Sequence, residues 1–381
     1  MAEFVNPYNF VRSGYNRNKA GRPLSHDRID VDLYSGRLHC SLTTISRITT
    51  ESFDYTKEGR IYGSSLKGMI RSVAETMAQA CSPLGGTKCR RADNLCICCR
   101  VFGWLDGGNA HTGRVHISDA LPQGSNWREQ GTTYIEWQAL SSPKPNRHPH
   151  FYPSEGRKFY YHHHYDPSRP EQKITQQPRT PQGDKNDQIF VAKANQTFSF
   201  EVDFTDLTGA ELGLLLYALQ LKDGWYHKFG KAKPLGFGTV KIAIDATELL
   251  PPNRYDDWDT HPTPLESLPL SAVGMQQSLA PSEANVDVDP IWKGLSAEER
   301  RAKFTEARVE EFFQHQFGIP HRQAATLPHW RDLDHLLRRH DDYPIRYPSQ
   351  NWFRKNGSVK LPTAEEVEGN PPGDRSKWLK E

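Results

Sequence analysis

No stretch of this sequence is apolar for long enough to cross a bilayer. The longest apolar run, residues 214–219, is far shorter than the roughly 20 residues that a membrane-spanning helix needs. The first residues, Met1-Ala2-Glu3-Phe4-Val5-Asn6-Pro7, lack the basic start and the apolar core of a signal peptide. We therefore expect a soluble, cytoplasmic protein that has no membrane partner.

Net charge and the common catalytic motifs are missing as well. The chain has 48 Lys and Arg residues against 46 Asp and Glu residues, a net charge of +2. A case for nucleic-acid binding must therefore rest on local charge, which residues 60–100 supply with seven basic and two acidic side chains. The sequence contains no Walker phosphate loop, no serine-hydrolase elbow and no zinc-protease motif.

Alternating apolar residues and apolar stripes at helical spacing predict six main elements. We expect strand, helix, strand, strand, helix, strand, in the segments 36–45, from Gly63 onward, 113–118, 196–204, 208–221 and 239–245. This order matches the ferredoxin-like β-α-β-β-α-β unit. RNA-recognition domains share that architecture, although a fold alone does not give a function.

The stretch Gly63-Ser64-Ser65-Leu66-Lys67-Gly68-Met69-Ile70-Arg71 is typical of a glycine turn that opens a helix. Gly63 permits the tight turn, and we expect Ser64 or Ser65 to cap the helix. Lys67 and Arg71 are one turn apart and share a face. A helix N-terminus with two such cations suits phosphate groups. An ordinary capped helix with a solvated basic face is the alternative interpretation.

Five of the six cysteines lie within residues 81–99. In a reducing compartment such a cluster indicates a metal site more than disulfides. Cys96 and Cys99 have the spacing of a zinc knuckle, and Cys81 and Cys89 are the expected remaining ligands of a structural Zn²⁺ ion. Cys98, His111 and His116 are alternative ligands, and free thiols or a redox site are the alternative interpretation.

A second glycine-rich loop, residues 230–238, places Lys231 and Lys233 beside Gly236 and Gly238. Glycines let backbone amides approach a phosphate or a base closely, and the lysines add charge. A plain turn between two elements explains the same pattern equally well.

The segment 120–195 is too long for a passive connector. It mixes aromatic residues with cations, as single-stranded RNA binding requires; the cations are Lys144, Arg147, Arg157, Lys158, Arg169 and Lys173. A disordered polar loop is the alternative. We expect the tract His162-His163-His164 to be exposed and to serve neither metal binding nor acid–base chemistry.

Candidate catalytic carboxylates are few. Glu51 and Asp54 lie between the first expected strand and Gly63. A carboxylate beside a phosphate-binding turn can position a divalent ion such as Mg²⁺ or an attacking hydroxyl group. Simple solvated carboxylates are the alternative.

The expected fold class is α+β. A ferredoxin-like, RRM-like palm over residues 1–248 contains a zinc knuckle at 81–99 and a loop or hairpin insertion at 120–195. A linker rich in Pro, Ser and Asp follows over 249–290. A helical extension over 291–360, opened by a capping box at Ser296-Ala-Glu-Glu299, and a tail over 361–381 complete the chain.

Several of these motifs, in this order, resemble the RAMP superfamily, and specifically the backbone subunits of type III CRISPR effector complexes. They are the helix start at Gly63, the knuckle Cys96-Ile-Cys-Cys-Arg-Val-Phe-Gly103, the strand Gly113–Ala120, and the loop Gly236-Phe237-Gly238. The opening Asn6-Pro7-Tyr8-Asn9-Phe10-Val11, with Ser25-His26-Asp27, is similar to one subgroup.

The resemblance implies a ferredoxin-like palm that stacks along a CRISPR guide RNA beside other CRISPR-associated subunits. Ser64, Ser65, Lys67 and Arg71 would lie against the guide backbone, and a hairpin inside 120–195 would wedge between guide and target RNA. Some members of the family cut the target RNA with an acidic residue and a divalent ion, and Asp54 is the nearest candidate by position.

We therefore favour a guide-RNA-binding backbone subunit of a type III CRISPR ribonucleoprotein. One alternative is that the same subunit is a metal-dependent endoribonuclease that cleaves target RNA or processes the guide precursor. The other alternative is a zinc-stapled protein-interaction module that has no role in RNA binding.

Overall fold

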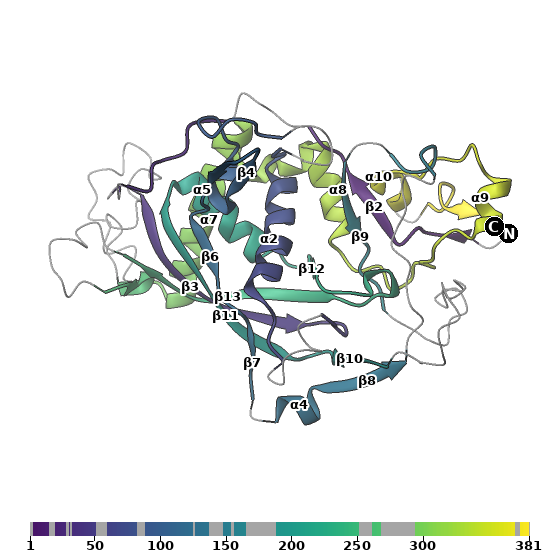
Figure 1. Ribbon diagram of the computed structural model, residues 1–381, viewed down its shortest axis with the longest axis horizontal. Helices are drawn as coiled ribbons and strands as arrows, with labels where there is room; N and C mark the ends of the chain where they lie inside the picture. Colours follow the sequence, from purple (N-terminus) through teal and green to yellow (C-terminus); the bar gives the residue numbers. More distant parts are fainter. Residues whose placement is uncertain are drawn as a thin grey trace.

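The structure is a computed structural model of the 381-residue chain. It describes residues 3–14, 20–27, 30, 33–50, 59–81, 88–124, 126–136, 148–153, 156–164, 188–250, 261–267, 294–369 and 374–380. These residues form a mixed α+β fold around an antiparallel sheet (Figure 1). Within these ranges, no helix combines the length and the apolar character needed to span a membrane.

Three long strands form the centre of the sheet: β3 (Tyr34–Thr44), β11 (Thr197–Leu207) and β13 (Thr239–Leu249). β3 lies between the other two and pairs antiparallel with both. The path across the sheet is β12-β13-β3-β11-β6, and its outer strands are β12 (His227–Lys228) and β6 (Val115–Ile117). β7 (Leu121–Pro122) and β14 (Thr263–Pro264) add short pairings to β11 and β13.

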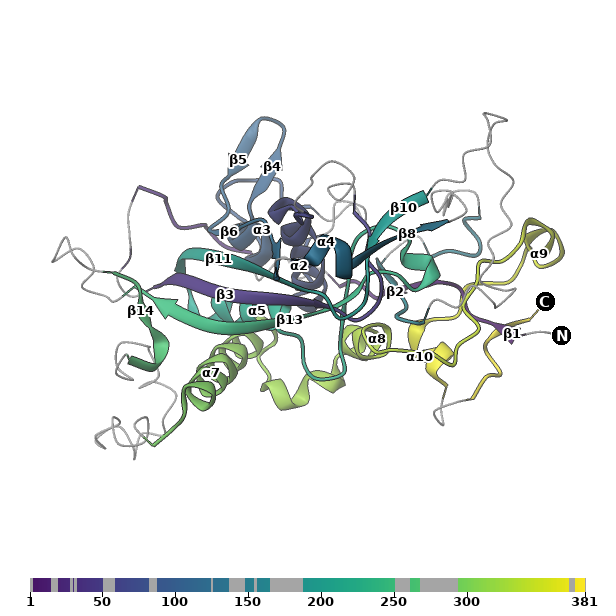
Figure 2. The same ribbon diagram turned by 90° about the horizontal axis from the view of Figure 1, so that it is seen from below.

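The two faces of the sheet differ in chemistry. Alternation places Leu38, Cys40 and Leu42 of β3 in the core, on the face that α2 (Gly63–Met77) and α5 (Gly209–Leu219) cover (Figure 2). The opposite face carries partly exposed charges. There Arg37 donates to Asp203 (Nε–Oδ1, 2.6 Å), and His39 lies between the carboxylates of Glu201 and Glu248, 3.5 and 3.3 Å away.

α7 (Ala297–Phe317) packs along α5 and extends the same core. A side chain at Gly213 of α5 would collide with the carbonyl oxygen of Arg308, since an added Cβ would lie 1.9 Å from it. The expected capping box is present: Glu299 N–H donates to Ser296 Oγ (3.2 Å), and Ser296 N–H donates to the Glu299 carboxylate (2.8 Å). The 3₁₀ helix η7 (His321–Thr326) and α8 (Pro328–Leu336) follow, so the C-terminal helices share the core of the sheet.

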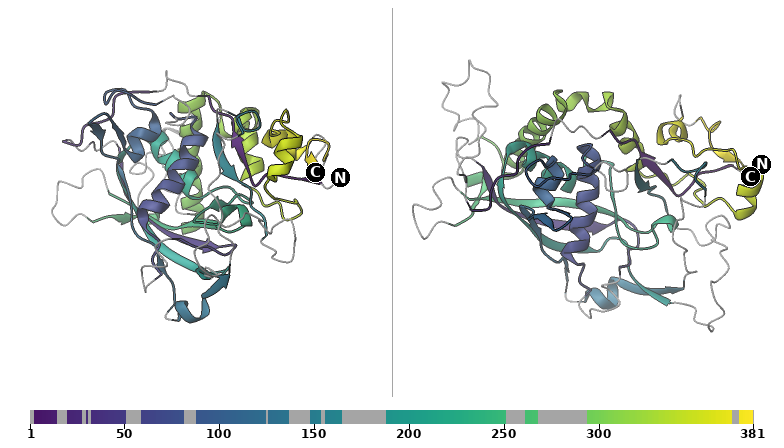
Figure 3. Two further views of the ribbon diagram at one scale, coloured as in Figure 1. Left: turned by 45° about the vertical axis from the view of Figure 1, so that its right-hand side comes forward. Right: turned by 45° about the horizontal axis from the view of Figure 1, so that its top comes forward.

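A smaller aromatic core brings the two ends of the chain together (Figure 3). β1 (Glu3–Phe4) pairs with β15 (Leu379–Lys380), and β2 (Tyr8–Val11) pairs with β9 (Arg157–Tyr160). Phe4, Tyr8, Phe151, Tyr152 and Trp352 are buried in this core. α9 (Gln350–Lys355) and α10 (Ala364–Glu368) complete this end of the molecule.

The remaining elements are short. α3 (Ile97–Phe102) and the hairpin of β4 (Trp104–Asp106) and β5 (Asn109–His111) follow the cysteines. α4 (Trp127–Gln130) precedes the pair of β8 (Thr132–Glu136) and β10 (Gln188–Ala192), and the 3₁₀ helices η4 (Lys233–Leu235) and η5 (Leu265–Ser267) flank β13.

Candidate nucleic-acid interface and metal centre

The start of α2 is held by a residue from outside the helix. Tyr62 occupies the N-cap position without a capping side chain, so the expectation that Ser64 or Ser65 caps the helix is wrong. Instead, the N–H of Gly63 donates to Asp119 Oδ1 at 2.8 Å. Gly63 is needed for packing, because a Cβ there would lie 2.1 Å from the carbonyl oxygen of Ile117.

The exposed face at the start of α2 consists of small polar residues and one aromatic ring. Ser64, Ser65 and Gly68 are exposed, and 39% of the surface of Tyr62 is exposed to solvent. The first turn contains no acidic side chain. A Cβ added at Gly68 would meet no atom within 4 Å, so internal packing gives no reason for a glycine at this position. The low side-chain bulk lets a polyanion approach the backbone of this exposed face closely.

The two predicted cations of α2 are partly buried and already donate hydrogen bonds inside the protein. Lys67 Nζ donates to the carbonyl oxygen of Val115 (2.6 Å), and burial, with the charge of Arg71 nearby, lowers the pKa of Lys67. Arg71 Nε donates to Glu75 Oε1 (2.8 Å), and Arg157 of β9 contacts the other carboxylate oxygen at 2.5 Å. The positive charge of Arg71 is offset in part by Glu75.

Four cysteines form a compact sulfur cluster. The Sγ atoms of Cys81, Cys89, Cys96 and Cys99 all lie within 4.8 Å of one another, and all four residues are buried. The distances from Cys81 Sγ to those of Cys99 and Cys96 are 3.5 and 3.7 Å, close to the about 3.8 Å edge of a tetrahedron with 2.3 Å metal–sulfur bonds. All four are free thiols, without a disulfide. The cluster can therefore hold a metal ion such as zinc.

Contacts within the cluster lower the pKa of two thiols, Cys89 and Cys96, and raise that of the other two. Hydrogen bonds from its neighbours, led by Cys81, lower the pKa of Cys89, and the same contacts raise the pKa of Cys99. The N–H of Cys96 also donates to Cys89 Sγ (3.2 Å). Thiolate is the form that binds metal.

The alternative ligands lie outside the cluster. Cys98 is fully buried in apolar surroundings, which raises its pKa. His111 Nε2 lies 3.2 Å from the carbonyl oxygen of Arg100, and His116 is exposed on β6. Among the described residues, the four cysteines are the group that can hold a metal ion.

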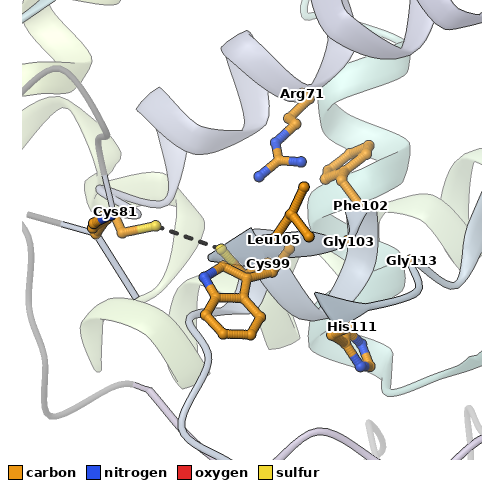
Figure 4. Close-up of a pocket in the computed structure, with 10 residues that line it drawn as sticks. Arg71, Cys81, Cys99, Phe102, Gly103, Leu105, His111 and Gly113 are labelled. Carbon is orange, nitrogen blue, oxygen red and sulfur yellow. Dashed lines mark hydrogen bonds between the residues drawn. The ribbon is translucent and has the colours of Figure 1, made fainter. Parts of the chain in front are cut away.

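A cavity of about 560 Å³ opens beside the sulfur cluster (Figure 4). Arg71, Cys99, Phe102, Leu105 and His111 contribute to its wall. Figure 4 shows the guanidinium group of Arg71 turned from α2 toward this space. Burial lowers the pKa of His111.

The second glycine loop is a tight turn whose amides are used internally. Gly236 and Gly238 are buried, with φ of +88° and +85°. Gly238 N–H donates to the carbonyl oxygen of Arg47 (2.8 Å), and Lys231 N–H donates to that of Thr49 (2.8 Å). Lys231 is exposed, whereas Lys233 is partly buried, with Nζ 2.5 Å from the carbonyl oxygen of Gly230.

The described part of the 120–195 segment builds core structure. Phe151, Tyr152 and Tyr161 are buried, so these rings support the fold and are not free to stack on bases. The expectation of an exposed histidine tract is wrong for His162 and His163, which are 0% and 3% exposed. Burial lowers the pKa of His163 to about 3.

Some site residues lie outside the described part of the chain, and others were not predicted. Glu51 and Asp54 are outside the described residues, as are Lys144, Arg147, Arg169 and Lys173. Asp119 as the partner of the α2 start, and Arg157 as the partner of Glu75, were missed. Both residues lie far from α2 in the sequence, so no local sequence pattern indicates these contacts.

A comparison with protein-family models gives a match. The family model of the RAMP superfamily matches residues 38–241, which run from β3 through the cysteine cluster to the start of β13. No curated protein matches the chain.

Proposed function

Because this chain belongs to the RAMP superfamily, we propose that it binds CRISPR guide RNA as a backbone subunit of a type III effector complex. In this role it holds the guide and the guide–target duplex beside other CRISPR-associated subunits. A ferredoxin-like palm is part of the proposal. The order β3, α2, β6, β11, α5, β13, with both helices on one face of an antiparallel sheet, supports it.

The observation that carries the proposal is the exposed start of α2. Ser64, Ser65 and Gly68 present backbone and hydroxyl groups without bulk, and the first turn itself contains no acidic side chain. An exposed glycine within a helix costs about 1 kcal/mol relative to alanine, and no neighbour in the structure requires Gly68. A ribose-phosphate strand lying against this face would require it, and Lys67 and Arg71 add positive charge to the same helix.

The open face of the sheet is a poorer RNA surface. RNA-recognition domains stack bases on aromatic residues of the sheet. Here the corresponding strands present Arg37 and His39 between three carboxylates, Glu201, Asp203 and Glu248. Those carboxylates would repel phosphate, so the helix edge is the better site.

The glycine loop contributes through its lysines in this proposal. Lys231 and Lys233 supply charge, while Gly236 and Gly238 shape the turn that presents them. The glycines shape the turn and do not contact RNA through the Gly238 amide, because that amide already donates to the carbonyl oxygen of Arg47.

We assign the sulfur cluster as a structural zinc site. Four cysteines complete a tetrahedron and leave no open position for a substrate. Trp104 Nε1 donates to the carbonyl oxygen of Cys89 (2.8 Å), and Arg157 donates to that of Cys81 (2.6 Å). These bonds tie the cluster to the β4–β5 hairpin and to β9, so the metal would hold this side of α2 in place.

Cleavage of target RNA remains a second candidate, because the segment that contains Asp54 leads directly into the α2 start. Asp54→Ala is expected to abolish Mg²⁺-dependent cutting of target RNA and to leave RNA affinity unchanged. Glu58→Ala, in the same segment of the sequence, is the control. Equal cutting by both variants and the wild-type protein would remove Asp54 from consideration.

RNA copurification tests the main proposal. The protein is expressed with its neighbouring CRISPR subunits and a CRISPR array, and nucleic acid is extracted from the purified complex. We expect RNA of defined length that contains repeat and spacer sequence. An intact complex without RNA would contradict the proposal and favour the protein-interaction module.

A further inference from the structure

A two-stranded hairpin projects from the region of the sulfur cluster (Figure 2). In its register, Leu105 of β4 lies opposite Ala110 of β5, and both residues are exposed to solvent. Leu105 is 77% exposed, the highest value among the large apolar residues that the structure describes. A Cβ added at Gly107 or Gly108, at the tip, would meet no atom within 4 Å. Packing within the protein therefore gives no reason for a leucine at this position.

The base of the hairpin is fixed by hydrogen bonds to the cysteine segment. Trp104 Nε1 donates to the carbonyl oxygen of Cys89 (2.8 Å), and Lys88 Nζ donates to Asp106 Oδ1 (2.7 Å). These bonds hold β4 against the segment that contains the proposed metal ligands. A side chain on a fixed support loses little conformational freedom when a partner covers it. Leu105 is therefore well placed to contact a second molecule.

The cavity beside the sulfur cluster opens next to the same hairpin. Leu105 contributes to its wall together with Phe102, Trp104 and Arg71. Its volume of about 560 Å³ lies within the range of protein binding pockets. None of the described residues that line it is acidic. The hairpin thus adds an apolar rim to a cavity that has a basic wall.

The guanidinium group of Arg71 supplies positive charge to this cavity, toward which Figure 4 shows it turned. Its Nε donates to Glu75 Oε1 at 2.8 Å, and this is the hydrogen bond that its side chain donates within the described part of the chain. Its two terminal nitrogens are left for a further acceptor. Lys88, the other strongly basic residue of the wall, is paired with Asp106. The cavity therefore suits a single carboxylate better than a chain of phosphates.

The exposed apolar surface suits a protein side chain better than a nucleic-acid base. Bases bind to proteins by stacking on exposed aromatic rings. Phe102 and Trp104 are 4% and 9% exposed, so neither ring presents a face of that size. Leu105 and Ala110, which are exposed, are aliphatic. Burial of such apolar surface is the dominant favourable contribution to most protein–protein association.

We propose that the β4–β5 hairpin and the adjoining cavity dock a neighbouring protein subunit. That subunit places an apolar side chain against Leu105 and Ala110 and directs an Asp or Glu carboxylate to the terminal nitrogens of Arg71. The inference rests on the proposed function, which places other CRISPR-associated subunits beside this chain. It assigns them a surface about two helical turns from the start of α2, so the partner and the RNA contact different parts of the molecule.

Photo-crosslinking in the assembled complex tests this surface. The protein carries p-benzoylphenylalanine in place of Leu105, and it is expressed with its neighbouring CRISPR subunits and a CRISPR array. We expect irradiation to link it to another protein subunit, in a segment where an apolar residue lies near an Asp or Glu. The same group in place of Ala302, exposed on α7, is the control and should not give this product. Figure 2 shows α7 far from the hairpin.

Leu105→Asp provides the quantitative test. We expect this variant to bind the crosslinked partner subunit about tenfold more weakly, because the new carboxylate removes the apolar contact and repels the acidic group of the partner. Leu105→Met keeps an apolar side chain, and Ala302→Asp adds the same charge elsewhere, so both should bind the partner like the wild-type protein. The melting temperature of Leu105→Asp and its affinity for single-stranded RNA should match those of the wild-type protein.

The outcomes separate this inference from the proposed function. A crosslink to RNA, or none to another subunit, would overturn the docking surface, as would wild-type partner affinity in Leu105→Asp. A lowered melting temperature in Leu105→Asp would also overturn it, because Leu105 would then have a structural role. A crosslinked segment without an acidic residue would overturn the role of Arg71. These results would leave the proposed function intact if the wild-type complex still carries RNA. Absence of both RNA and partner subunits from the purified wild-type protein would overturn both proposals.

Discussion

Asp119 accepts a hydrogen bond from the backbone N–H of Gly63, with 2.8 Å between Oδ1 and N. This one contact joins the second residue after β6 to the first residue of α2, and it satisfies an amide that the helix itself leaves unpaired. The other carboxylate oxygen lies 3.3 Å from Arg60. The start of the proposed RNA-binding helix is therefore fixed by a side chain from another part of the chain.

Replacement of Asp119 tests this contact. We expect Asp119→Ala to lower the free energy of unfolding by about 1 kcal/mol, as loss of a helix N-cap does. Asp119→Asn keeps an oxygen acceptor for the N–H of Gly63, so its free energy of unfolding should fall by less. Urea unfolding of the three proteins measures the difference. Equal stability of the alanine variant and wild type would show that the contact contributes nothing to folding.

The metal assignment predicts different effects for two neighbouring cysteines. Cys99 belongs to the sulfur cluster and Cys98 does not. Cys99→Ser should reduce bound zinc to well below one ion per chain and lower the melting temperature strongly, because metal binding contributes directly to folding. Cys98→Ser should keep the zinc. Metal analysis under reducing conditions distinguishes them, and zinc retained by Cys99→Ser would contradict the proposed ligand set.

Two glycines of α2 should respond in opposite ways to alanine. Gly68→Ala is expected to stabilise the free protein by about 0.5–1 kcal/mol through helix propensity and to weaken RNA binding by crowding the strand. Gly63→Ala should destabilise the protein, since the new Cβ meets the carbonyl oxygen of Ile117. Urea unfolding and RNA titration of both variants provide the measurement. Unchanged RNA affinity in Gly68→Ala would mean that no ligand lies against that face.

Stability should fall as pH is lowered from about 6.5 toward 4. Burial lowers the pKa of His227 to about 4, whereas the unfolded chain has the ordinary value near 6.5. Between these values the unfolded state binds more protons, so its free energy drops relative to the folded state. The contribution of one such histidine is at most about 1.4 kcal/mol per pH unit.

His227→Gln should make the dependence of unfolding free energy on pH less steep than in the wild-type protein. Urea unfolding at several pH values measures both slopes. A slope in His227→Gln equal to that of wild type would show that His227 is accessible to protons in the folded state.

The central sheet and its two helices could be predicted because each shows its own periodicity. The alternation of Phe198, Phe200, Val202 and Phe204 indicates β11 without reference to any other segment. The smaller core could not be predicted in this way. β1 and β2 are two and four residues long, and they exist through pairing with residues far away in the chain, at Leu379 and Tyr160.

In the candidate site, too, the features set by neighbouring residues could be predicted, and those set by distant residues could not. The four cysteines lie close in sequence, and their spacing indicated a shared metal before the fold was known. The partners of Gly63 and Glu75 depend on contacts that span 56 and 82 residues. His162 looked like a surface residue because its burial comes from β13 and the 339–340 segment, which no local pattern reveals.

The affinity of the purified protein for single-stranded RNA, measured across a range of salt concentrations, tests the central claim most directly. If the start of α2 binds a ribose-phosphate strand, the logarithm of the association constant falls linearly with the logarithm of the salt concentration. The slope is about 0.7 per phosphate contacted. Ser65→Glu then weakens binding at least tenfold by adding a negative charge to the interface. Binding that is independent of both salt and the charge at position 65 would contradict the account.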